Sequence, residues 1–90
     1  MKVENKLNDR FTLPIPGAGE GVLLYRRGRN NALDLYSTVV PEAARGQNLG
    51  DKLVRAALDF AKQDGVKIIP TCPYVAHWFS KHPEESGMLL

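Results

Sequence analysis

The stretch that decides the fold is residues 40–50, V-P-E-A-A-R-G-Q-N-L-G. Before it, apolar residues follow the two-residue alternation of an extended strand, which Pro41 closes. After it, apolar residues recur every three or four positions, as on one face of an amphipathic helix. The stretch therefore predicts a strand–loop–helix connection, with a glycine-containing loop at the start of the helix.

The first half of the chain predicts strands. Phe11, Leu13 and Ile15 alternate as in a half-buried strand, and further extended segments follow at residues 22–26 and 33–40. The connections are rich in turn residues, with prolines and glycines over residues 14–21 and Gly-Arg-Asn-Asn over residues 28–31. We interpret this half as a small antiparallel meander.

The second half predicts a helix, a strand and a second helix. The first helix ends at Gly65, where a C-terminal cap is expected, and residues 66–69 form a short β-branched strand. Pro73 suits the first turn of the next helix, which Pro83 ends. The apolar face of the first helix comprises Leu49, Leu53, Val54, Ala57, Leu58 and Ala61, and that of the second Val75, Trp78 and Phe79. Because a strand–helix–strand crossover usually pairs its strands in parallel, we expect an α+β fold: an antiparallel strand meander followed by a helix, a parallel strand and a short C-terminal helix.

Length and composition indicate one domain spanning residues 1–90 of the 90-residue chain. The net charge of +2 is too small to indicate a nucleic-acid partner, and Arg26, Arg27 and Arg29 are expected to form the solvated tip of a hairpin. A lone cysteine excludes an internal disulfide, and neither a signal peptide nor a membrane span is apparent. We therefore expect a cytoplasmic protein with no membrane partner.

The loop before the long helix can bind phosphate. Backbone N–H groups at a helix start lack partners within the helix, and Gly46 allows a phosphate to approach the backbone closely. Arg45 adds a fixed positive charge with a forked donor geometry. The alternative is a plain strand-to-helix connection, in which Gly46 and Gly50 serve the turn and the packing.

Residues 45–50, R-G-Q-N-L-G, resemble the R/Q-x-x-G-x-G/A signature with which the GNAT superfamily of N-acetyltransferases binds the pyrophosphate of acetyl-CoA. Residues 70–76, P-T-C-P-Y-V-A, and 81–84, K-H-P-E, resemble the closing blocks of a minimal branch of that superfamily. The similarity runs in order from about residue 25 to residue 84. It implies a compact GNAT-like fold, acetyl-CoA as cosubstrate and an amine acceptor. It places the cosubstrate against Val39, Val40, Arg45, Gly46, Gln47, Asn48, Leu49 and Gly50.

The chain departs from the family pattern at three places. Asn48 replaces the first glycine of the signature, and since asparagine tolerates a left-handed backbone, we predict a dihedral there that glycine would adopt easily. Val39 stands where the family tends to carry an acidic residue that can act as a base. Residues 14–20 leave no room for the helices of larger members, so we expect an open, shallow acceptor site.

Three residues are candidates for catalysis. Cys72, at a predicted helix start that favours the thiolate, either accepts the acetyl group, positions the thioester, or is a small buried core residue. Tyr74 either donates a proton to the departing CoA thiolate or simply packs. His77 is either the base for the amine or a solvated helix residue. We assign His82 a structural role at the helix end.

The sequence thus predicts transfer of an acetyl group from acetyl-CoA to an amine. The alternatives are an acyl-CoA-binding module with little or no catalysis and an interaction domain that binds no nucleotide. No feature selects a protein tail, a polyamine or another small amine as the acceptor, and none fixes the oligomeric state.

Overall fold

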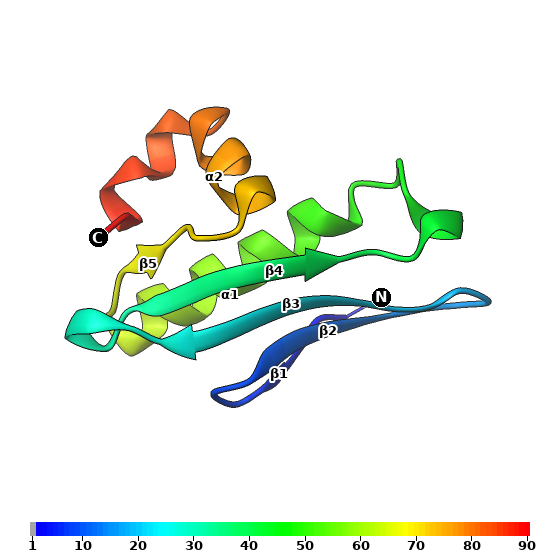
Figure 1. The fold of residues 1–90 in the computed structure, drawn as a ribbon, viewed down its shortest axis with the longest axis horizontal. Helices are drawn as coiled ribbons and strands as arrows, with labels where there is room; N and C mark the ends of the chain where they lie inside the picture. Colours follow the sequence, from blue (N-terminus) through cyan, green and yellow to red (C-terminus); the bar gives the residue numbers. More distant parts are fainter. Residues whose placement is uncertain (1) are drawn as a thin grey trace.

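A computed structural model describes residues 2–90 as a five-stranded sheet with two α-helices (Figure 1). The strands are β1 (Glu4–Lys6), β2 (Arg10–Ile15), β3 (Gly19–Arg27), β4 (Leu33–Val39) and β5 (Ile68–Ile69). The helices are α1 (Leu49–Asp64) and α2 (Pro73–Ser80), with short 3₁₀ turns at Arg29–Asn31, Glu42–Ala44 and Pro83–Met88.

The strands lie in the order of the sequence, β1-β2-β3-β4-β5. The first four are antiparallel, with Phe11 opposite Leu23 and Leu23 opposite Thr38, whereas β5 is parallel to β4. This arrangement confirms the predicted α+β fold. The pairing of β3 with β4 shifts by one residue between Leu24 and Tyr25, so that Tyr36 of β4 is an extra, bulged residue.

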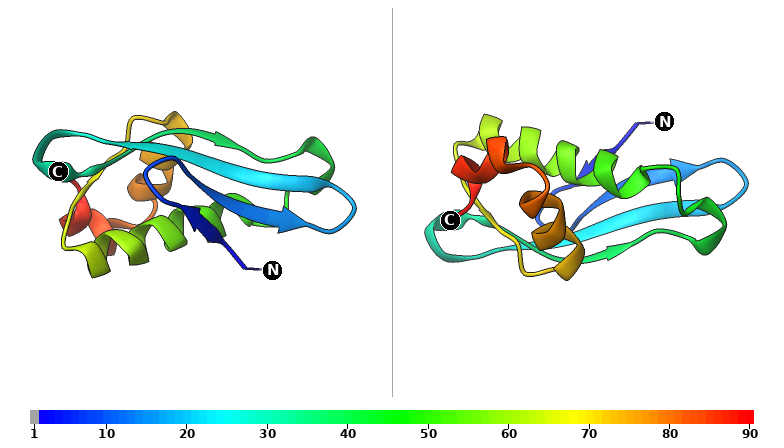
Figure 2. Two further views of the ribbon diagram at one scale, coloured as in Figure 1. Left: turned by 90° about the horizontal axis from the view of Figure 1, so that it is seen from below. Right: turned by 90° about the horizontal axis from the view of Figure 1, so that it is seen from above.

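The core lies between one face of the sheet and α1, and α2 packs beside α1 at the β4–β5 side of the sheet (Figure 2). The predicted apolar faces of both helices are buried, which confirms the helices predicted from the three- and four-residue spacing of apolar residues. Gly21 on β3 lets α1 approach, because a Cβ atom there would lie 3.3 Å from Leu53 Cδ1. Helix α1 ends at Gly65 as predicted, with a left-handed φ of 72° and its N–H bonded to carbonyls of the last turn.

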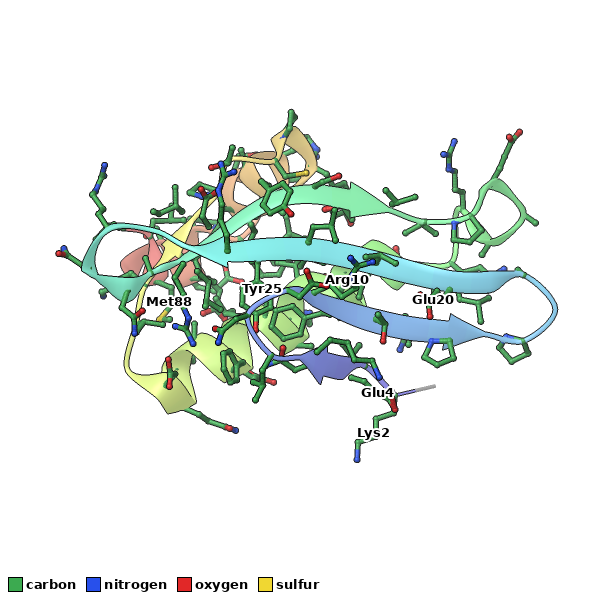
Figure 3. The ribbon with its side chains drawn as sticks, turned by 60° about the horizontal axis from the view of Figure 1, so that its bottom comes forward. Lys2, Glu4, Arg10, Glu20, Tyr25 and Met88 are labelled. Carbon is green, nitrogen blue, oxygen red and sulfur yellow. The ribbon has the colours of Figure 1, made fainter. Side chains whose placement is uncertain are left out.

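The opposite face of the sheet carries no helix within the described residues (Figure 2). Arg10 on β2 and Glu20 on β3 lie on this open face, whereas the buried ring of Tyr25 lies on the α1 side (Figure 3). Because the chain turns directly from β2 into β3, no further element covers the open face there.

The two edges of the sheet differ from the sequence prediction. Strand β1 was not predicted, because a three-residue polar strand carries no apolar alternation. At the other edge β5 is shorter than the predicted segment, residues 66–69, and spans only Ile68–Ile69. The C-terminal segment lies along it, with a bridge between Ile68 and Leu89 and a hydrogen bond from Leu90 N to Ile68 O.

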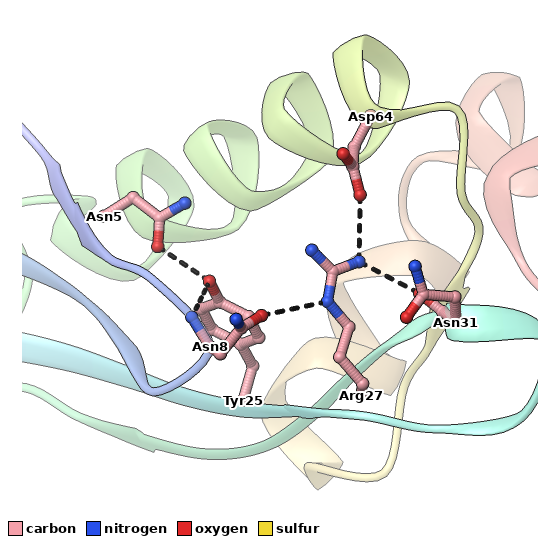
Figure 4. Close-up of polar contacts among 6 residues, drawn as sticks. All are labelled: Asn5, Asn8, Tyr25, Arg27, Asn31 and Asp64. Atoms are coloured by element: carbon pink, nitrogen blue, oxygen red, sulfur yellow. Dashed lines mark hydrogen bonds and ion pairs between the residues drawn. The ribbon is translucent and has the colours of Figure 1, made fainter.

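The predicted arginine tip is wrong for Arg27, which is half-buried. Its guanidinium donates to Asn8 Oδ1 at 3.1 Å and to the carbonyl of Asn31 at 3.0 Å, and it pairs with Asp64 at 3.0 Å (Figure 4). It also lies over the ring of Phe60. Arg27 therefore ties the β1–β2 turn and the β3–β4 connection to the end of α1.

No helix among residues 2–90 is both long enough and apolar enough to cross a lipid bilayer.

Candidate functional site

A cavity of about 460 Å³ opens where β4 ends and α1 begins. We call it the cradle cavity. Its lining comprises Thr38, Val39, Val40, Ala44, Arg45, Gly46, Asn48, Leu49, Gly50 and Tyr74. The structure thus brings together all the residues predicted to contact the cosubstrate except Gln47, which is exposed outside the lining.

The loop beneath the cavity has two left-handed residues. Gly46 has a φ of 88°, and a Cβ added there would meet nothing within 4 Å, so the backbone is open to solvent. Asn48 has φ 58° and ψ 29°, which confirms the predicted left-handed dihedral. Within residues 2–90 no side chain caps the start of α1. The first N–H groups of the helix therefore remain available to an anion, favoured by the partial positive charge of the helix end.

Arg45 borders the same loop. Its side chain is exposed, and Nε donates a 3.3 Å hydrogen bond to the carbonyl of Val40. This contact folds the side chain back along the loop toward the end of β4. The guanidinium group thus adds positive charge at the rim of the cradle cavity.

Gly50 and Tyr74 are in direct contact across α1 and α2. A Cβ atom at Gly50 would lie 2.6 Å from Tyr74 Oη and 2.7 Å from its Cζ, so only glycine lets the phenol ring lie over the first turn of α1. Burial raises the pKa of Tyr74, and the charges of Asp51 and Cys72 add to the rise. The phenol therefore keeps its proton near neutral pH and can donate it.

Cys72 is the residue before α2 and lies behind Thr38 in the wall of the cradle cavity. It is only 5% exposed, and its N–H donates to the carbonyl of Leu35 at 2.8 Å. Its Sγ lies 3.4 Å from Oγ1 of Thr38, which does line the cavity. Burial raises the pKa of the Cys72 thiol, but hydrogen bonds from the Thr38 hydroxyl and from backbone N–H groups, including that of Val75, bring the net pKa below its usual 9.0.

The residue before Cys72 is also held to β4. Thr71 Oγ1 donates to Oδ1 of Asp34, a carboxylate that is only 9% exposed. Arg26 Nε donates to the other oxygen of Asp34 at 3.0 Å and lies over the ring of Tyr36. The start of α2 is therefore fixed to β4 by side-chain and backbone contacts together.

A second cavity, of about 360 Å³, lies between the start of α1 and α2. We call it the basic hollow; its lining comprises Asn48, Asp51, Tyr74, His77, Trp78, Lys81 and His82. Because Asn48 and Tyr74 line both cavities, the basic hollow adjoins the cradle cavity. His77, the candidate base, lies in the hollow and not in the cradle lining.

One wall of the basic hollow is an ordered polar cluster. Asp51 accepts hydrogen bonds from Trp78 Nε1 at 2.7 Å and from Arg55 Nε at 3.0 Å. Burial raises the pKa of Asp51, but these two donors and the Arg55 charge lower it more, so that the carboxylate stays ionised. His82 stacks on Trp78 with ring centroids 3.9 Å apart, consistent with its expected structural role.

Sequence reasoning missed Thr38, Asp34 and Asp51. The ion pair of Asp51 was predictable from the sequence, because its four-residue spacing to Arg55 is typical of a helical ion pair. The contacts of Thr38 with Cys72 and of Asp34 with Thr71 were not predictable, since each joins residues more than thirty positions apart in the sequence. Only the parallel pairing of β4 with β5 brings these residues together.

Comparison with known proteins agrees with this architecture. Residues 10–88 match the sequence model of a family described as GCN5-related N-acetyl-transferase. The chain is 35% identical over 85 residues to Protein NATD1 of Gallus gallus, covering 92% of this chain and 77% of the relative. Protein NATD1 of Homo sapiens is 34% identical over 85 residues, with coverage of 92% and 75%, and that of Danio rerio is 33% identical, with coverage of 92% and 77%.

The family match spans strands β2 to β5, the loop after β4 and both helices, and therefore includes every residue of both cavities. The sheet order and the parallel β4–β5 pair also agree with the fold that the resemblance implied. The chain belongs to the GCN5-related N-acetyltransferase family.

Proposed function

We propose that the protein transfers an acetyl group from acetyl-CoA to an amine, with the pyrophosphate of the cosubstrate held over the loop from Arg45 to Gly50. The observation that carries this proposal is the uncapped start of α1, which opens into the cradle cavity beside two left-handed residues. Such a backbone presents N–H groups to a phosphate without a Cβ atom in the way at Gly46. Family membership supports acetyl-CoA as the cosubstrate, since the family generally uses it.

The proposed reaction needs few groups from the protein. The amine nitrogen bonds to the acetyl carbon while the carbon–sulfur bond of the thioester breaks, and the amine loses a proton. Backbone N–H groups near Val39 and Val40 polarise the carbonyl, and Tyr74, whose raised pKa keeps it protonated, gives its proton to the departing thiolate. His77 or water takes the proton from the amine. Cys72, behind Thr38, positions the thioester in this proposal and is not itself acetylated.

A second candidate function is an acyl-CoA-binding module with weak catalysis. No carboxylate or imidazole is among the residues of the described chain that line the cradle cavity. Val39, at the position where a base would be useful, offers an exposed aliphatic side chain instead. In this candidate the cosubstrate binds as proposed, but turnover with any amine stays slow.

Isothermal titration with acetyl-CoA tests the cradle. Gly46→Asp places a negative charge against the pyrophosphate and should weaken binding by about tenfold or more, because like charges in contact cost several kcal/mol. Gly17→Asp is the matched control: Gly17 in the β2–β3 turn has a similar φ of 75° and open space around it. It should bind normally. Equal affinity of both variants and the wild type would place the cosubstrate elsewhere.

A turnover assay separates the two candidate functions. Release of free CoA thiol is followed with a panel of small amines, a polyamine and lysine-containing peptides. Amine-dependent release at a rate well above the uncatalysed reaction supports the transferase. Tight binding without such release, across the panel, supports the module.

A further inference from the structure

The Lys81-His82-Pro83 block has no role in the proposed reaction, yet two of its residues line the basic hollow. Lys81 is the first residue after α2, and its backbone N–H bonds to carbonyls of the last turn of that helix. His82 is fixed by its stacking on Trp78 and by a 2.7 Å contact between its Nδ1 and the carbonyl of Trp78. These contacts hold the block at the mouth of the hollow.

The hollow contains basic groups that no acidic side chain of the described residues neutralises. Its only carboxylate, Asp51, already accepts from Trp78 on one oxygen and pairs with Arg55 on the other. Among the described residues no ion pair or side-chain hydrogen bond engages the ammonium of Lys81 or the imidazole of His77. The hollow therefore presents an uncompensated positive charge together with the free imidazole of His77.

This arrangement suits an anion and not an amine. A protonated amine would meet the Lys81 ammonium, while the negative charge of Asp51 is already paired with Arg55. A phosphate would instead gain the Lys81 ammonium as a partner and an N–H donor from His77. The acceptor amine therefore approaches the thioester from another side, and of the two proton acceptors named above only water is compatible with this inference, since His77 lies in the hollow.

We propose that the basic hollow binds the 3′-phosphate of the CoA cosubstrate, with Lys81 as its main charged contact. The inference rests on the proposed function, in which the pyrophosphate lies in the adjoining cradle. CoA carries a second, separate phosphate on its ribose, and the hollow is the basic site that shares Asn48 and Tyr74 with the cradle cavity. One ligand can thus place its two phosphate groups in the two neighbouring cavities.

The test compares CoA with 3′-dephospho-CoA, which differs only in that phosphate, by isothermal titration at fixed low salt. The wild type should bind CoA about fivefold more tightly, as for one exposed ammonium–phosphate contact. Lys81→Met keeps the aliphatic stem and removes the charge, so CoA affinity should fall to that of 3′-dephospho-CoA. The affinity of Lys81→Met for 3′-dephospho-CoA should equal that of the wild type, which also shows that the variant is folded.

Lys52→Met is the matched control. Lys52 is an exposed residue of α1 outside both linings, and its loss changes the net charge equally. It should keep the preference for CoA. The proposal is overturned if the wild type shows no preference, if Lys81→Met retains it, or if Lys52→Met loses it equally. If the wild type binds CoA and 3′-dephospho-CoA equally well, the 3′-phosphate site is refuted but the proposed function stands. If it binds neither compound, both the proposed function and the 3′-phosphate site are refuted.

Discussion

Replacing Gly50 with alanine should displace Tyr74 without unfolding the protein. The new methyl group would lie 2.6 Å from Tyr74 Oη, whereas ordinary van der Waals contact begins near 3.4 Å. The phenol must therefore retreat by about 1 Å from the junction of the two cavities. It can do so, because Tyr74 is 42% exposed and borders the open space of both cavities.

The cost in stability is small, and the cost in turnover is larger. Alanine in place of glycine within α1 gains about 0.5–1 kcal/mol of helix stability, which offsets part of the lost Tyr74 packing. We therefore expect the free energy of unfolding to stay within about 1 kcal/mol of the wild type. If Tyr74 donates the proton to the thiolate, kcat should fall about tenfold, which is less than the roughly hundredfold or greater loss usual for a general acid, because a thiolate leaves readily.

The assay is a double-mutant cycle on kcat with Tyr74→Phe. Tyr74→Phe alone should lower kcat by a similar factor, and adding Gly50→Ala should lower it little further, because the hydroxyl is already gone. Acetyl-CoA affinity is measured in parallel for all four proteins, and also for Tyr74→Ala with and without Gly50→Ala. If Gly50→Ala weakens acetyl-CoA binding equally in a Tyr74→Ala background, the methyl group meets the ligand itself. Displacement of Tyr74 would then not be the cause of the lost activity.

Three further predictions concern the site and its support. Thr38→Val should raise the pKa of Cys72, followed as thiolate absorbance of the only thiol. In the wild type the unfolding free energy should rise with pH between the lowered pKa of Cys72 in the folded state and 9.0, because the unfolded state binds more protons over that range. Thr38→Val should make this rise smaller. Asn48→Gly should preserve or improve CoA affinity in titration calorimetry, since glycine adopts the φ of 58° readily, and a clear loss would make the amide itself a ligand contact. Tyr25→Phe should cost about 1–3 kcal/mol in thermal unfolding, because the buried hydroxyl donates to Asn5 and accepts from the N–H of Asn8 (Figure 4), and an unchanged melting temperature would contradict this.

Elements with a local cause were predictable from the sequence. The buried face of α1 follows from its three- and four-residue spacing, and the end of the helix follows from Gly65. The left-handed backbone at Asn48 was predictable because few other non-glycine residues tolerate it. The lining residues between Arg45 and Gly50 were predictable as a glycine-containing loop at a helix start, whereas Val39 and Val40 were implied by the family resemblance.

Features created by distant contacts were not predictable. We predicted a solvated Arg27 because its partners Asn8 and Asp64 lie in other parts of the chain. The contact between Thr38 and Cys72 depends on how β4 meets the start of α2. The basic hollow likewise joins the start of one helix to the end of another, which no local pattern reveals.

The buried carboxylate of Asp34 has a consequence for how the chain avoids wrong pairings. Strand β5 meets β4 at only two residue pairs, Leu33 with Ile68 and Asp34 with Ile69, so its backbone alone distinguishes poorly between the native alignment and one slipped along the strand. A slipped chain would carry Thr71 away from Asp34 and leave a buried oxygen without its donor, at a cost of about 1–3 kcal/mol. Since Cys72 follows Thr71 directly, the contact that rejects the misaligned strand also determines which atoms of β4 the thiol faces.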